Sequence, residues 1–188
     1  MRILVLGAGV IGSFNAARLQ QGGHEVELLA RGRRLDDLRH HGVVLEEFRT
    51  GHRSAVLVPL IDRIDPRTGY DVVLVVVRRN QVASVLPMLA THQRTPTCLF
   101  LGNNASGPDD MIRSLGRERV VTGMVNAGGE REGHVVRLRR IWIQQFYRDV
   151  DNTTGQQEVR RREDTPDGEG LPPGRDRLIS PGLGGVVQ

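Results

Sequence analysis

The sequence contains no lysine, because all 26 of its Lys+Arg residues are arginine. Without a side-chain amine, the chain offers no Schiff-base nucleophile, no P-loop lysine and no lysine general acid. The 22 acidic residues leave a formal net charge of only +4, which is weak support for nucleic-acid binding. The arginines also lack the interleaved aromatic residues on which single-stranded nucleic acids stack. Nucleic acid is therefore not the expected partner.

Cysteine is nearly as scarce, since Cys98 is the only one. A disulfide within the chain is therefore excluded, and a cytoplasmic setting fits. Cys98 lies in the apolar stretch TCLFL, so we expect a small buried hydrophobic residue there. The sequence also lacks any run approaching 18 consecutive apolar residues, and we expect no membrane span. Its opening, MRILVLGAGVIG, has no small-residue cleavage site, so no signal peptide is expected.

The first 140 residues show apolar strand-like segments that alternate with helix-like segments. This alternation is typical of βαβ units, and it predicts an α/β fold with a Rossmann-like, doubly wound, mostly parallel sheet. We expect 43–45 and 55–58 to form a hairpin and 135–138 to be an edge strand. The predicted strands cover residues 2–6, 25–30, 43–45, 55–58, 71–77, 97–101, 120–125 and 135–138. The predicted helices cover residues 10–21, 35–41, 82–90 and 109–115.

The character of the sequence changes after about Arg140. The later segment QQEVRRREDTPDGEGLPPGRDR is charged and rich in Gly and Pro. Such a segment cannot bury enough apolar area to offset the entropy lost on ordering. We therefore expect one folded domain over residues 1–140 and an irregular, low-order tail over residues 141–188.

The sharpest motif is GAGVIG, in which Gly7, Gly9 and Gly12 have the spacing G-x-G-x-x-G. It follows a predicted buried strand and opens a predicted amphipathic helix, the context in which this spacing indicates a dinucleotide-binding loop. The first glycine permits a tight turn, the second lets the backbone approach a pyrophosphate, and the third lets the helix pack closely on the sheet. Backbone N–H groups at the helix start then face the anion. The alternative is an ordinary tight turn, but the motif makes residues 1–140 a predicted dinucleotide-binding domain.

The end of the second predicted strand decides which dinucleotide is expected. An acidic residue there would bond the ribose 2′-OH of NAD, but the strand ends in Arg31, followed by Arg33 and Arg34. A guanidinium suits a 2′-phosphate through its charge and paired donors, so NADP, as NADPH, is the predicted cofactor. A solvated surface position is the alternative for Arg31 and the favoured interpretation of Arg33 and Arg34.

Four segments, taken in order, resemble the ketopantoate reductases (2-dehydropantoate 2-reductases). They are MRILVLGAGVIGSFNAARLQQGGHEVELLARG, YDVVLVVVRRNQV, LFLGNNASG and VVTGMVNAGGEREGHVV. The resemblance extends over residues 1–138. It implies a Rossmann domain followed by a helical domain, with the active site between them. It also implies NADPH-dependent reduction of ketopantoate to pantoate, in pantothenate and coenzyme A biosynthesis.

The resemblance also implies a set of site residues. Asn103 matches a family asparagine that touches both cofactor and substrate, and Asn104 replaces the glycine that usually follows it. A turn-forming role is the alternative for Asn103. The implied cofactor-binding positions are Gly7, Ala8, Gly9, Val10, Ile11, Gly12, Arg31, Asn103 and Gly129.

Arg78 takes the place of a family lysine, beyond the carboxyl end of a predicted parallel strand. Ligands of open α/β sheets bind at that edge. An arginine can hold a carboxylate but cannot release a proton near neutral pH, so we expect Arg78 to clamp the substrate. An exposed surface position is its alternative, and Arg79 is expected to be solvated.

The family's helical domain supplies a lysine proton donor and a ligand-binding glutamate, and we expect that domain to be absent from this chain. Catalytic residues therefore stay unassigned, apart from the substrate-side candidates Asn103 and Arg78. We expect a truncated or frame-disrupted relative with weak activity or none. No cluster of His, Cys or Asp has metal-ligand spacing, so no metal site is predicted.

The sequence thus leaves two functions open. The first is a cytoplasmic NADPH-dependent reductase of a small 2-keto acid, without a membrane or nucleic-acid partner and with homo-oligomerisation left open. The second is a non-catalytic NADP-binding module or remnant, which would bind NADPH tightly without turnover.

Overall fold

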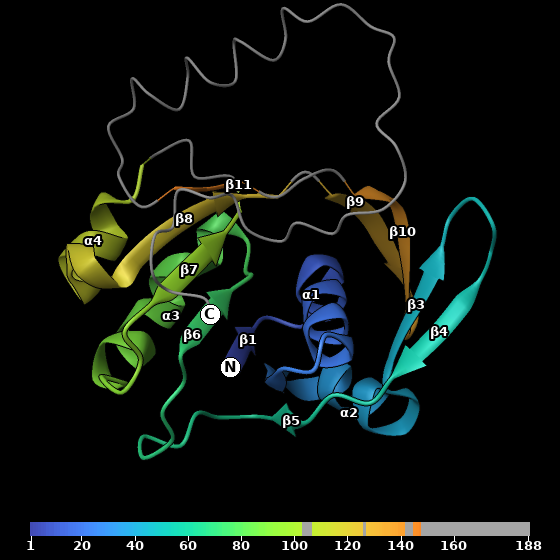
Figure 1. Cartoon of the computed structure of the whole chain (residues 1–188), viewed down its shortest axis with the longest axis horizontal. Coiled ribbons are helices and arrows are strands. Elements are labelled where there is room, and N and C mark those ends of the chain that lie inside the picture. Colours follow the sequence, from blue (N-terminus) through green and yellow to red (C-terminus); the bar gives the residue numbers. More distant parts are fainter. Residues whose placement is uncertain (103–106, 126, 142–144, 148–188) are drawn as a thin grey trace, which may run out of the picture.

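The computed structural model describes residues 1–102, 107–125, 127–141 and 145–147. These residues contain a seven-stranded sheet with the order β11-β8-β7-β6-β1-β2-β5 (Figure 1). The strands from β8 to β5 run parallel, and β11 pairs antiparallel with β8. The predicted Rossmann-like α/β fold is therefore confirmed. The strands are β1 (Arg2–Leu6), β2 (Glu25–Leu29), β5 (Leu60–Ile61), β6 (Val72–Val75), β7 (Cys98–Leu101), β8 (Val120–Met124) and β11 (Gln145–Tyr147).

Helices cover both faces of this sheet. Successive side chains of a strand point to opposite faces, so the apolar strands bury side chains on both sides. Ile3 and Val5 of β1 pack with α1 and α2, whereas Leu4 and Leu6 pack with α3 and α4. In the parts of the chain that the structure describes, no helix has the length and apolar character needed to traverse a bilayer. The helices are α1 (Val10–Gln21), α2 (Gly32–His41), α3 (Arg79–Thr91), α4 (Asp109–Leu115) and the 3-10 helix η1 (Arg117–Arg119).

The predicted boundaries are accurate for α1, which begins with apolar residues, and for α4, which follows Pro108. Both α1 and α4 begin and end at the predicted residues. Gly22 is the C-cap residue of α1, and Gly23 after it has φ +82°. In contrast, α2 begins at Gly32 and α3 at Arg79, each three residues before its predicted start. Their first turns, GRR and RNQ, are polar, so a periodicity argument does not detect them.

A second sheet of four strands, with the order β4-β3-β10-β9, packs against α1 (Figure 1). The predicted hairpin of β3 and β4 is confirmed, but the prediction that 135–138 is an edge strand was wrong. β10 lies between β3 and β9, and β9 was missed because its sequence AGGERE has no apolar alternation. The strands are β3 (Val43–Glu47), β4 (Arg53–Val56), β9 (Ala127–Glu132) and β10 (Val135–Ile141).

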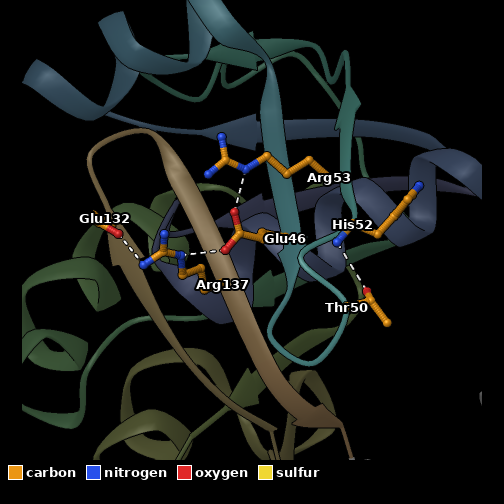
Figure 2. A network of polar contacts seen from close by, with 6 residues as sticks. All are labelled: Glu46, Thr50, His52, Arg53, Glu132 and Arg137. Carbon is orange, nitrogen blue, oxygen red and sulfur yellow. Dashed lines mark hydrogen bonds and ion pairs between the residues drawn. The ribbon is translucent and has the colours of Figure 1, made fainter.

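A charged network joins all four strands of the second sheet (Figure 2). The carboxylate of Glu46 on β3 accepts hydrogen bonds from Arg53 Nε at 2.5 Å and Arg137 Nε at 2.6 Å. Arg137 also forms an ion pair with Glu132 on β9. The hydrogen bond from Arg53, together with that from Arg137 and despite partial burial, lowers the pKa of Glu46 below its ordinary value. The network therefore couples β4 to β9 across the sheet.

The predicted tail lies largely outside the described residues, which omit 142–144 and 148–188. Within residues 141–188, the structure describes the end of β10 at Ile141 and the strand β11. The sequence analysis did not predict β11.

Candidate functional site

A cleft with a volume of about 1040 Å³ opens at the carboxyl ends of the central parallel strands. Leu6 at the end of β1, Leu29 at the end of β2 and Leu101 at the end of β7 all line it. In open α/β sheets, ligands bind at this edge of the sheet. The cleft is therefore the candidate functional site, and its size suits a ligand as large as a dinucleotide.

The glycine loop forms one wall of the cleft, and its three glycines serve different purposes. Gly7 has φ +115°, and a Cβ there would overlap the carbonyl oxygen of Val76. A Cβ at Gly12 would overlap the carbonyl oxygen of Gly7, so Gly12 lets α1 approach the loop itself. A Cβ at Gly9 would meet no atom within 4 Å. The bare surface at Gly9 is therefore open to a ligand in the cleft.

The start of α1 offers backbone donors to this cleft. Gly9 is the N-cap residue and makes no side-chain capping hydrogen bond. The first backbone bond that closes a turn runs from the Ser13 N–H to the Gly9 carbonyl, at 2.9 Å. The N–H groups before Ser13 have no intrahelical acceptor, and the first turn contains no acidic residue. The uncapped end of a 12-residue helix thus provides a positive dipole and free donors for an anion.

The arginines after β2 have three different environments. Arg31 is exposed, is the N-cap residue of α2 and lines the cleft, and its Nη2 lies 3.9 Å from Met88 Sδ. Arg33 is exposed and does not line the cleft. The solvated position expected for Arg34 was wrong, because its side chain is half-buried and hydrogen-bonds to the carbonyl of Ala8. Because Arg34 and Ala8 are far apart in the sequence, no local sequence pattern predicts this hydrogen bond.

Arg78 and Arg79 follow β6, and they differ in exposure and in ion pairing. Arg78 is exposed and lines the cleft as the N-cap residue of α3, and its backbone N–H donates to Gln81 Oε1 at 3.2 Å. The solvated position expected for Arg79 was wrong, because Arg79 Nη1 pairs with Asp110 Oδ2 at 3.0 Å. Although burial acts in the opposite direction, this pair lowers the pKa of Asp110. Arg78 is therefore the freer of the two guanidinium groups.

The structure brings most of the predicted site residues to one cleft. Gly129 on β9 lines it beside Val10 at the start of α1, and a Cβ there would overlap the carbonyl oxygen of Arg137 and press on the side chain of Val10. Asn103 and Asn104 lie outside the described residues. The sequence analysis missed Ser84, Glu130 and Arg131, which also line the cleft. The predicted positions that do so are Gly7, Ala8, Gly9, Val10, Ile11, Gly12, Arg31, Arg78 and Gly129.

Ionisable groups of the cleft are almost entirely cationic. Among the lining residues that the structure describes, they are Glu130 and five arginines, at positions 31, 34, 78, 79 and 131. No group of three or more His, Cys, Asp or Glu residues within the described ranges could hold a metal ion. The chemistry of the cleft is therefore that of an anion-binding site.

A sequence profile described as "Ketopantoate reductase PanE/ApbA" matches residues 3–147. The chain belongs to this ketopantoate reductase family. A comparison with curated proteins finds no match. The matched range includes the glycine loop and all the described residues that line the cleft.

Solved structures of ketopantoate reductases share the fold. The probable 2-dehydropantoate 2-reductase of Bacillus subtilis has a TM-score of 0.68 and 19% identity, over 85% of this chain and 53% of that one. The enzyme of Geobacter metallireducens has a TM-score of 0.68 and 20% identity, over 85% and 53%.

A structure of D-mandelate dehydrogenase with NADH and anilino(oxo)acetate is also similar, with a TM-score of 0.68 and 17% identity, over 85% of this chain and 52% of that one. This chain therefore spans about half the length of these structures. At such identities the likeness establishes the shared fold alone.

Proposed function

We propose that this chain binds NADPH in the cleft and belongs to the machinery that reduces a 2-keto acid, ketopantoate to pantoate. The observation that carries the proposal is the glycine loop, with its open surface at Gly9 and the uncapped start of α1. Family membership over residues 3–147 supports the choice of reaction. We infer that residues 1–140 form the dinucleotide-binding domain.

The residues of the cleft fit a nicotinamide dinucleotide. Gly7, Gly9 and Gly12 with the α1 N-terminus would hold the diphosphate, and Gly129 would lie near the cofactor. Arg31, which is exposed at the cleft, would bind the 2′-phosphate. A bound NADPH would supply the hydride for reduction of a ketone. Arg78 would hold the substrate carboxylate, and its guanidinium would stay protonated throughout.

A second candidate is a module that binds NADP without turnover. The observation that favours it is the ionisable lining of the cleft, which consists in the described residues of five arginines and Glu130. Reduction of a ketone requires a proton for the new alkoxide, and an arginine does not supply one near neutral pH. If residues outside the described ranges contribute no donor, binding without catalysis is the expected behaviour.

Titration of the purified chain with NADPH and NADH, followed by a turnover assay with ketopantoate, tests these functions. NADPH binding with oxidation of NADPH supports the reductase, and NADPH binding without oxidation supports the module. If neither dinucleotide binds, both candidates fail.

Replacing Arg31 tests the choice of cofactor. We expect Arg31→Ala to weaken NADPH binding by about tenfold, the effect of one charge-assisted contact, and to leave NADH binding nearly unchanged. Isothermal titration calorimetry measures both affinities. Arg33→Ala is the matched control, since it removes the same charge from an exposed residue outside the cleft lining. An unchanged preference for NADPH in Arg31→Ala contradicts the assignment.

A further inference from the structure

Arg34 connects three parts of the chain beneath the glycine loop. It lies in the first turn of α2, and its half-buried side chain extends toward α1. Its Nε donates to the carbonyl oxygen of Ala8 at 3.1 Å, and its Nη2 donates to Ser13 Oγ at 2.9 Å. Its Nη1 donates to the carbonyl oxygen of His134, in the turn between β9 and β10, at 3.2 Å. One guanidinium therefore binds the loop, the first helix and the second sheet.

The carbonyl of Ala8 receives two of the hydrogen bonds in this arrangement. Besides Arg34 Nε, the hydroxyl of Ser13 donates to it at 3.2 Å, and Ser13 is fully buried. A peptide unit is planar and trans, so its C=O and N–H point in opposite directions. Holding the Ala8 carbonyl against Arg34 and Ser13 thus turns the N–H of Gly9 away from them. Gly9 lines the cleft, so that N–H becomes available to a ligand.

The charge of Arg34 adds to the effect of its geometry. Its three acceptors, two carbonyls and a hydroxyl, carry no formal charge. Burial and the neighbouring Arg131 lower the pKa of Arg34, and Asp37 acts in the opposite sense. A guanidinium nevertheless stays protonated at physiological pH. A fixed positive charge therefore lies next to the N-terminus of α1, where the helix dipole already favours an anion.

We propose that Arg34 is a positioning residue for the diphosphate of the dinucleotide. It fixes the Ala8–Gly9 peptide so that the Gly9 N–H faces the cleft, and it anchors the loop to the turn at His134. The identity of the anion rests on the proposed function. The roles of Arg31 and Arg34 then differ: Arg31 distinguishes NADPH from NADH, whereas Arg34 serves the diphosphate that both contain.

Dinucleotide affinity separates these two roles. Arg34→Met removes all three donors and keeps much of the apolar length of the side chain. We expect it to weaken NADPH and NADH binding by the same factor, about tenfold or more, with their ratio unchanged. Arg33→Met is the matched control, because it removes an exposed charge one residue away, outside the cleft lining. The proposal is overturned if Arg34→Met binds both dinucleotides normally, or if it loses affinity for NADPH alone.

Amide hydrogen exchange of the ligand-free protein tests the positioning role without any dinucleotide. Amides of residues 8–13 should exchange about tenfold faster in Arg34→Met than in Arg33→Met, while those of β7 stay unchanged. Equal exchange in the loop overturns the proposal. If the unaltered chain binds neither dinucleotide but loop exchange rises in Arg34→Met, the proposed function fails and the positioning of the loop stands. Ser13→Ala, which removes one hydroxyl, should change both measurements in the same direction and serves if Arg34→Met does not fold.

Discussion

At the scale of single residues, Gly7 and Gly9 lie in one loop but are glycine for different reasons. Gly7 has φ +115° and no room for a Cβ beside the Val76 carbonyl, whereas Gly9 has φ −73° and open space. The first requirement comes from the fold, and we propose that the second comes from the dinucleotide. The two can be separated by the same substitution at each position.

We expect Gly7→Ala to destabilise the fold, by about 1–2 kcal/mol from the left-handed backbone alone and more from steric overlap. Gly9→Ala should cost about 1 kcal/mol or less, because alanine is a poorer N-cap residue than glycine, but it should weaken dinucleotide binding, because the new Cβ faces the cleft. Urea unfolding and calorimetric titration measure the two effects. A Gly7→Ala protein as stable as the unaltered chain would contradict the structure.

His92 predicts how stability depends on pH. It is 3% exposed, and burial, with the nearby charges of Arg119 and Arg94, lowers the pKa of His92 below its ordinary value of about 6.5. Above pH 6.5 both folded and unfolded chains carry a neutral His92. As pH falls below 6.5, the unfolded chain takes up the proton first, so stability decreases, with a limiting slope of about 1.4 kcal/mol per pH unit.

Denaturant unfolding between pH 7.5 and about 5 measures this slope. The variant His92→Gln should flatten it. The control His52→Gln removes an exposed histidine and should leave the slope unchanged. Equal slopes in His92→Gln and the unaltered chain would show that another group is responsible.

Several residues that line the cleft were predictable because their signals are local. The glycine spacing, the strand before it and Arg31 all lie within one βαβ segment. Arg34 was not predictable, because its acceptor on His134 is 100 residues away. The pair of Arg79 and Asp110 likewise joins the starts of two helices that meet only in the folded chain.

At the scale of elements, the main sheet was more predictable than the second one. Buried parallel strands are continuous apolar runs, and β1, β6 and β7 have that character. β9 contains two glycines and three charged residues, and its strand conformation comes from pairing with β10. The edge position expected for 135–138 was wrong for this reason.

The carboxylate of Glu46 is expected to hold the second sheet together. Glu46→Gln should lower the melting temperature, because two arginine hydrogen bonds lose their charged acceptor. The lowered pKa of Glu46 means that its contribution is present above the unfolded value of about 4.5 and is lost as pH falls through the folded value. The melting temperature of Glu46→Gln should therefore lie further below that of the unaltered chain at pH 7 than at pH 3.

Differential scanning calorimetry at these two pH values measures the deficit. Glu47→Gln, which alters the exposed neighbour on the same strand, is the control. Equal melting temperatures for Glu46→Gln and Glu47→Gln would contradict a special role for the buried carboxylate.

At the scale of the whole molecule, the charge of the cleft predicts a dependence on salt. Five arginines and one glutamate line it in the described residues, so binding of an anionic dinucleotide should weaken as ionic strength rises. Affinity should fall more steeply for NADPH than for NADH, because the 2′-phosphate adds charge. Titrations between about 0.05 and 0.5 M NaCl test this, and parallel slopes for the two dinucleotides would contradict it.

The thiol of Cys98 can serve as a chemical probe for opening of the central sheet. It is the only cysteine of the chain, it is fully buried in β7, and burial raises the pKa of its thiol. A maleimide reagent can therefore modify the protein only when the strands around β7 separate. The rate of that single modification reports how often the sheet opens. If an added dinucleotide slows the modification, the decrease in rate measures how much the ligand stabilises the folded chain, and no enzymatic turnover is needed.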